Sequence, residues 1–204
     1  MVASVQNPAD LVNIALARIG SKHSVGDLYD GSMESNILLN VYAQTRDELL
    51  RMHDWGFAER DATLVLLKQQ PLNAYIPPVY WSNIYPPIPW EFQYDYPADC
   101  LKIRSIKPVP MFIPDFDPQP YIFKIANDRT YTPTKKVILC HVENAVMVYT
   151  AQVTDPLVWE ASFVEAFAAS LARRIAPALI GLDAAKAEGQ DEGVETAIAI
   201  IKQG

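Results

Sequence analysis

The chain has 204 residues, of which 50% are hydrophobic and 20% are charged, and this composition excludes a disordered chain. No apolar run approaches the ~18 residues that a membrane helix requires, so we expect no membrane partner. The formal net charge of −7 argues against a protein whose main task is to bind nucleic-acid phosphates.

Two helices are predicted near the start of the chain. Asn7 is a favourable N-cap, Pro8 suits the first helical position, and Gly20 ends the first helix. A second helix is predicted from after Asp30 to about His53, because apolar side chains recur there at helical spacing.

The middle of the chain has an unusual composition. Thirteen of the 16 prolines and thirteen of the 21 aromatic residues lie between Pro71 and Pro133, and no glycine occurs between Gly56 and Gly181. Proline restricts φ and aromatic side chains bury large areas, so this composition predicts rigid, extended chain packed against another surface.

Strand signals lie within and around this middle region. Cys100–Ile106 alternates in polarity, which predicts a half-buried strand. Two β-rich runs, residues 136–142 and 145–153, are separated only by Glu143 and Asn144, and this short separation predicts a hairpin. The predicted strands lie at about residues 62–68, 91–96, 100–106, 136–142 and 145–153.

Two further helices are predicted at the end of the chain. The third begins at Thr154-Asp155-Pro156, where a cap precedes a proline, and Pro177 is expected to end it. The last runs from about Leu182 to Lys202, and its glycines weaken it, so it requires a partner surface. Its narrow apolar face consists of Val194, Ala197, Ile198 and Ile201.

These elements together predict an α+β fold. We expect a helical bundle built from the N- and C-terminal segments, residues 1–60 and 154–204. A β-rich lobe that is rich in proline and aromatic residues, residues 61–153, is expected to be inserted into this bundle.

No catalytic, cofactor or metal site is predicted, and an enzyme is the weaker class. The histidines His23, His53 and His141 lack metal-ligand spacing, and no phosphate-binding or nucleophile motif occurs. Cys100 and Cys140 are interpreted as reduced thiols in apolar strands. His141 adjoins Cys140, but neighbouring strand residues point to opposite faces. A cysteine hydrolase is therefore the least favoured alternative.

Basic residues concentrate between Cys100 and Cys140, where seven Lys and Arg residues stand against three Asp residues. Nearby aromatic residues allow an interpretation as a surface on which nucleic-acid bases stack. The alternative is a solvated strand face that opposes acidic helices of this chain or of a neighbour. We favour the second interpretation, because the whole chain is acidic and the lysines alternate as exposed strand residues do.

Several short segments, taken in their order along the chain, are similar to segments of a known protein family. They read ADLVNIALARIG (residues 9–20), RDELLR (46–51), HDWGFA (53–58), FQYDYPADCL (92–101), YTA (149–151), TDP (154–156) and FVEA (163–166). In this order and spacing they resemble the head-to-tail adaptor family of short-tailed bacteriophages, which includes the tail tubular protein A group.

The resemblance implies a structural virion protein rather than an enzyme. Such adaptors form a ring of twelve copies beneath the portal protein, extend the DNA channel and receive the tail nozzle protein. The implied location is the head–tail junction of a virion assembled in the bacterial host cytoplasm. An acidic channel wall suits this role, because DNA then slides past without phosphate contacts that would hold it.

Two surfaces are candidates for contacts with partners. The apolar face of the last helix, Val194, Ala197, Ile198 and Ile201, is the candidate portal or subunit interface. The aromatic residues of the middle region are candidates for contacts with the nozzle or a neighbour: Tyr75, Tyr80, Trp81, Tyr85, Trp90, Phe112 and Phe116. The alternative function is a monomeric module that binds a partner or peptide with this aromatic, proline-rich middle.

Overall fold

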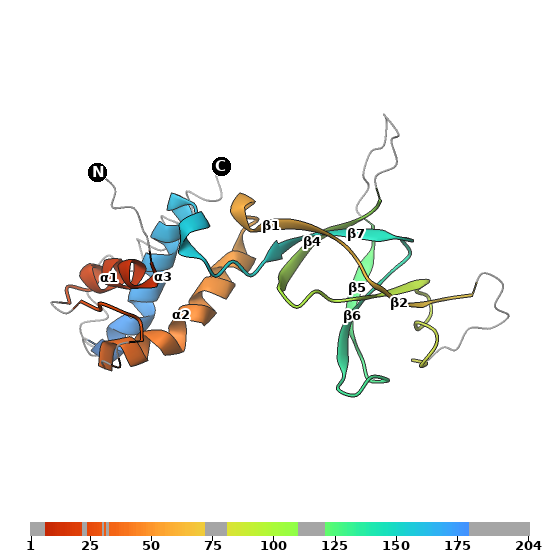
Figure 1. The fold of residues 1–204 in the computed structure, drawn as a ribbon, viewed down its shortest axis with the longest axis horizontal. Coiled ribbons are helices and arrows are strands. Elements are labelled where there is room, and N and C mark those ends of the chain that lie inside the picture. The colour runs from red at the N-terminus through yellow and green to blue at the C-terminus, as the bar shows by residue number, and fades with distance from the viewer. Residues whose placement is uncertain are drawn as a thin grey trace, which may run out of the picture. The chain divides into compact units, whose positions relative to one another are not determined.

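The structure, a computed structural model, describes residues 7–21, 24–29, 31, 33–71, 81–109 and 121–179 (Figure 1). The chain divides into two compact units, Met1–Ala58 together with Gln152–Gly204, and Glu59–Ala151. We call them the helical unit and the β unit. The sequence predicts domain boundaries at residues 60/61 and 153/154. A domain in that sense folds independently of the rest of the chain, so this division stays a prediction.

The expected helical bundle with an inserted lobe is wrong. The described residues contain three α-helices and two antiparallel sheets with seven strands. The described residues are roughly 36% helix and 28% strand, which is a mixed α+β fold. The physical reason is that the strands enclose a hydrophobic core of their own, so the helices do not organise the whole chain.

Helix α1 (Pro8–Arg18) has the predicted N-terminus. The Asn7 side chain accepts a hydrogen bond from the Asp10 backbone N–H at 3.0 Å, and the Asp10 carboxylate accepts one from the Asn7 N–H at 3.1 Å. This capping box satisfies two backbone donors that the helix cannot satisfy itself. Gly20 follows the helix with a φ of 71°, a conformation that glycine adopts without steric cost.

Helices α2 (Met33–Met52) and α3 (Ala161–Leu179) complete the helical unit, and α3 packs against both α1 and α2 (Figure 1). The predicted start at Thr154-Asp155-Pro156 is an Asp155-capped 3₁₀ turn, η2 (Pro156–Val158), and α3 begins only afterwards. Pro177 lies inside α3 and does not end it. Proline removes one hydrogen bond but keeps a helical φ, so the last turn continues.

Aromatic rings fill the core of the helical unit. Trp55 lies just before the 3₁₀ turn η1 (Gly56–Ala58), and its ring meets that of Phe163 edge to face at 4.9 Å between centroids. Trp159 meets Phe163 at 4.8 Å, and Tyr42 meets Phe167 at 4.9 Å. Edge-to-face pairs are favourable beyond the area that they bury, so they help to fix the packing of these helices.

The β unit consists of two antiparallel sheets. The first has the order β1-β7-β4, with strands β1 (Glu59–Thr63), β7 (Ala145–Ala151) and β4 (Cys100–Pro108). The second has the order β2-β3-β6-β5, with strands β2 (Leu66–Gln69), β3 (Phe92–Asp95), β6 (Lys135–Cys140) and β5 (Phe123–Asp128). The sequence analysis missed β5, whose apolar residues are interrupted by polar ones.

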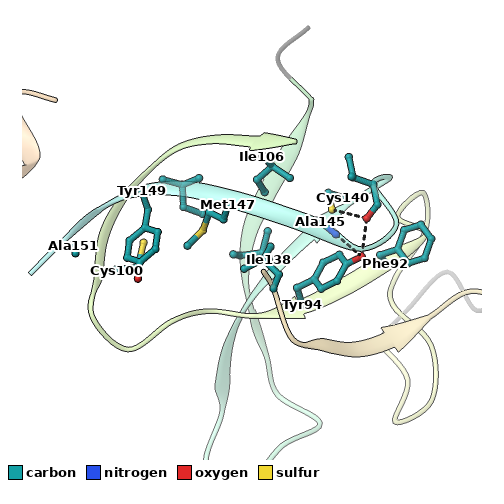
Figure 2. Packing of buried hydrophobic residues seen from close by; sticks show 13 residues of the cluster. Phe92, Tyr94, Cys100, Ile106, Ile138, Cys140, Ala145, Met147, Tyr149 and Ala151 are labelled. Atoms are coloured by element: carbon teal, nitrogen blue, oxygen red, sulfur yellow. Dashed lines mark hydrogen bonds between the residues drawn. The ribbon is translucent and has the colours of Figure 1, made fainter. Parts of the chain in front are cut away.

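The buried core of the β unit draws on both sheets. Ile106 and Met147 from the first sheet belong to the same cluster as Tyr94 and Ile138 from the second, and Figure 2 shows these side chains grouped together. All four are at most 2% exposed. At roughly 25 cal/mol per Å² of apolar area removed from water, this burial is the main stabilising contribution within the unit.

The predicted hairpin between residues 136–142 and 145–153 is wrong, because β6 and β7 belong to different sheets. Asn144 has a φ of 50°, and the chain passes from one sheet to the other here. The Tyr94 hydroxyl donates to the Val142 carbonyl at 2.7 Å and accepts from the Ala145 N–H at 3.4 Å (Figure 2). The predicted single strand at 62–68 likewise divides at Leu64, into β1 and β2.

The strict alternation predicted for Cys100–Ile106 is also wrong. Cys100, Ile103 and Ile106 are buried, so every third residue faces the core. The register with β7 shifts twice, between Cys100 and Lys102 and between Ile103 and Ser105. Each irregularity places an extra residue in β4, and this changes which side chains point inward.

Candidate functional site

Three of the predicted contact residues, Trp81, Tyr85 and Trp90, lie within the described part of the chain. All three are half-buried and belong to one segment, residues 81–90, which leads into β3. The other predicted contact residues lie outside the described residues: Tyr75, Tyr80, Phe112, Phe116, Val194, Ala197, Ile198 and Ile201.

Hydrogen bonds from β2 and the residue after it hold the 81–90 segment against the second sheet. The Lys68 ammonium donates to the Ser82 carbonyl, and the Gln70 side chain donates to the Pro86 carbonyl, each at 2.7 Å. The Ser82 hydroxyl accepts from the Tyr85 N–H at 2.9 Å, which closes a local turn. Two anchors four residues apart restrict this segment to one backbone path.

Lys68 belongs to a buried polar cluster. Its ammonium lies 2.5 Å from Asp128 Oδ2 and 2.9 Å from Thr130 Oγ1, and it sits over the Tyr131 ring. The Gln93 amide donates to the same Asp128 oxygen at 2.7 Å. The side chains of Lys68 and Asp128 are 2% and 0% exposed. The sequence analysis missed this cluster, because Lys68 falls in an apolar run and Asp128 follows 60 residues later.

The hydrogen bonds of this cluster keep Asp128 ionised. Burial alone raises the pKa of the Asp128 carboxyl, but the hydrogen bonds from Lys68, Gln93 and Thr130 outweigh it and hold this pKa below its usual range. Both charged groups are shielded from solvent, so the cluster is suited to fixing the 81–90 segment rather than to meeting a substrate.

The outer side of the 81–90 segment carries exposed apolar groups. Ile84 is 68% exposed and Ile88 is 40% exposed. The Trp90 ring stacks on that of His141, with centroids 5.2 Å apart. We call the residues Trp81, Ile84, Tyr85, Ile88 and Trp90 the 81–90 surface. Apolar and aromatic side chains held on a fixed backbone lose little entropy on association, and this favours a protein-binding role.

Neither cysteine has the surroundings of a nucleophile. Burial raises the pKa of both thiols, and Cys140 is fully buried with its sulfur 3.7 Å from the Val142 carbonyl. His141 lies on the exposed side of the chain, 3.3 Å from a Glu91 carboxylate oxygen. A reactive thiolate requires a lowered pKa and access, and the Cys140 thiol has neither.

The basic residues between Cys100 and Cys140 largely find partners within the β unit. Arg104 pairs with Glu59 at 2.5 Å, and Lys135 pairs with Asp95 at 2.9 Å. Lys136 lies 3.5 Å from the centroid of the Tyr96 ring. The acidic partners therefore lie on strands β1 and β3 rather than on the acidic helices that the sequence analysis expected, and the Arg104 side chain is only 9% exposed.

Among the residues that the structure describes, no three His, Cys, Asp or Glu side chains come together as a potential metal site. None of the described helices is long and apolar enough to span a membrane. No protein-family model matches the sequence, and no curated protein matches it.

Proposed function

We propose that the chain is a structural virion protein, a head-to-tail adaptor of a short-tailed bacteriophage. The observation that carries this proposal is the packing of the segments that resemble the adaptor family. The rings of Trp55 and Phe57, from an early segment, lie 4.9 and 5.2 Å from that of Phe163, in the last segment. Segments shared with a family are expected to build a common scaffold, and these build one core.

A similar contact supports the proposal in the β unit. The Tyr149 hydroxyl donates to the Asp99 carboxylate at 3.1 Å, and Arg60 pairs with Asp99 at 2.9 Å. Asp99 and Tyr149 lie in two different family-like segments, 50 residues apart. Segments that carry the resemblance are therefore in contact with one another inside the helical unit and inside the β unit.

In this role the chain forms a ring, expected to hold twelve copies, between the portal and the tail nozzle. We assign the 81–90 surface to the nozzle or a neighbouring copy. The last predicted helix, with its stripe of Val194, Ala197, Ile198 and Ile201, is assigned to the portal or a neighbouring copy. DNA passes through the acidic channel without sequence-specific contacts, and the chain acts structurally rather than as a catalyst.

The test is reconstitution with the portal protein of the same phage. We expect electron microscopy of the mixture to show a second ring beneath the portal ring, with a mass that corresponds to bound copies of the chain. The protein by itself is an incomplete test, because a portal can template the ring. A mixture in which the chain stays separate from the portal would contradict the proposal.

A second candidate function is a monomeric module that binds a partner or peptide, and the 81–90 surface favours it. The substitution pair Ile84→Asp and Ile88→Asp separates the two functions. For an adaptor, we expect nozzle attachment to fall at least about tenfold while the ring on the portal persists. Leu157→Asp, at a site 65% exposed in the helical unit, is the matched control. A monomeric module would bind neither portal nor nozzle.

A further inference from the structure

The second sheet of the β unit has two edge strands among the residues that the structure describes. In its order β2-β3-β6-β5, strands β2 and β5 each have a neighbouring strand on one side only. The outer side of an edge strand presents backbone N–H and C=O groups that can pair with a further strand. The sheet can therefore be extended at β2 and at β5.

Exposed apolar side chains lie at both of these edges. Leu66 on β2 is 48% exposed, and Val65, one residue before the strand, is 64% exposed. Ile125 on β5 is 43% exposed, and Ile122, one residue before the strand, is 77% exposed. Large apolar side chains that gather at an exposed edge are typical of a surface that a partner covers.

The edge strands of the first sheet differ, because charged side chains oppose pairing with a further strand. By contrast, β2 and β5 carry one exposed charge, at Lys124, since Lys68 and Asp128 are buried. Each edge strand of the first sheet carries three charged residues: Glu59, Arg60 and Asp61 on β1, and Lys102, Arg104 and Lys107 on β4.

The strand directions of the two edges are complementary. Each neighbouring pair in the second sheet is antiparallel, so β2 and β5 run in opposite directions across the four strands. When β5 of one copy lies beside β2 of the next, with the same face of the sheet upward, the antiparallel alternation continues. A contact between two different surfaces of each copy is the geometry that can close copies into a ring.

One row of apolar side chains runs across the second sheet from edge to edge. Leu66 lies opposite Tyr94, Tyr94 opposite Ile138, and Ile138 opposite Ile125. Directly opposed residues point to the same face of a sheet, and Tyr94 and Ile138 belong to the core of the β unit (Figure 2). The row therefore ends in an exposed apolar residue at each edge, and both ends lie on the same face.

We propose that β5 of one copy of this chain pairs antiparallel with β2 of a second copy, with Ile125 opposite Leu66. The row of apolar side chains then continues from one copy into the next, and both exposed ends are covered. Pairing of β5 with β5 would leave Leu66 exposed in each copy. The proposal rests on the proposed function, because it names the surfaces through which the copies of the ring meet.

The test mixes two full-length variants, Leu66→Cys and isotope-labelled Ile125→Cys, and treats the mixture with a short bis-maleimide. Intact-mass spectrometry separates the heterodimer from the two homodimers. The native Cys100 and Cys140 are buried, and burial raises the pKa of both thiols, so they contribute little to the products. We expect the heterodimer to exceed each homodimer by at least about tenfold, because strand pairing holds the two new thiols side by side.

Two further variants show whether any excess depends on the position of the thiol. Leu157→Cys, at a site 65% exposed in the helical unit, replaces Leu66→Cys as the matched control and is expected to give no excess of heterodimer. Gln69→Cys, opposite Phe92 on the same face of β2, is expected to reproduce the excess. It decides the test if circular dichroism shows that Leu66→Cys disturbs folding.

A heterodimer no more abundant than random pairing gives would overturn the proposal. An excess of the Ile125→Cys homodimer would also overturn it, because β5 would then pair with β5. A ring on the portal without the heterodimer excess rejects the edge pairing alone. The excess in a chain that stays separate from the portal rejects the adaptor function alone, so the two proposals fail separately.

Discussion

Lys68 donates from inside the second sheet to Asp128, Thr130 and the Ser82 carbonyl. We expect Lys68→Met to lower the free energy of unfolding by about 3 kcal/mol at neutral pH, because it leaves a buried carboxylate without its cation. Urea denaturation followed by fluorescence measures the change. Lys124→Met, at an exposed position of β5, is the control and is expected to cost at most about 0.5 kcal/mol. A loss no larger than that of the control would show that the pair is not stabilising.

The same cluster predicts how stability depends on pH. The pKa of Asp128 is lower in the folded protein than in the unfolded chain, so its ionised form contributes stability above the unfolded pKa. This contribution is expected to be constant between about pH 7 and pH 5 and to disappear as the pH falls below about 4. Urea denaturation of the wild type and of Asp128→Asn across this range measures it. Parallel pH curves for the two proteins would contradict the prediction.

Among the described helices, α1 has the most complete N-terminal capping motif, and substitution of its N-cap residue tests what that motif contributes to stability. Asn7→Ala removes the acceptor for the Asp10 N–H, so we expect a loss of about 1 kcal/mol in the free energy of unfolding. Asn7→Asp keeps an acceptor in the same place and is expected to retain most of the stability. Thermal denaturation followed by circular dichroism compares the three proteins. Equal losses for both variants would mean that the hydrogen bond is not the cause.

The strands show how local and tertiary information differ at the scale of elements. The sequence run 136–142 was correctly expected to form a strand, and β6 occupies most of it. Its partner was predicted wrongly, because proximity in sequence favours β7 whereas β6 pairs with β3 and β5. A strand's own residues report its periodicity, and pairing depends on side chains that arrive from elsewhere.

For the whole molecule, the topology predicts that the helical unit survives without the β unit. The chain leaves the helical unit into β1 and returns from β7, and these strands are paired antiparallel, with Glu59 opposite Thr150. The two ends are therefore neighbours, and a short Gly/Ser linker in place of Glu59–Ala151 closes the gap. We expect this variant to keep its helical circular dichroism signal and to unfold cooperatively in urea.

The aromatic core supports this expectation, since Trp55, Phe163 and Trp159 all belong to the helical unit. Loss of the helical signal after the excision would show that the β unit is required for the helices to fold. An insertion of the same linker between Gln70 and Pro71, with nothing removed, is the control for the linker itself.

Local sequence is sufficient to predict the first helix, with its cap at Asn7 and its end before Gly20, because caps and turn glycines act within a few residues of the chain. Composition alone also led to the prediction that Trp81, Tyr85 and Trp90 contact a partner, and this stays a prediction. Three features depend on tertiary packing: the strands enclose a second core, β6 and β7 belong to two different sheets, and Lys68 holds the 81–90 segment. The physical reason is distance along the chain: Lys68 and Asp128 are 60 residues apart, and a buried charge is stable only beside a partner that folding brings to it.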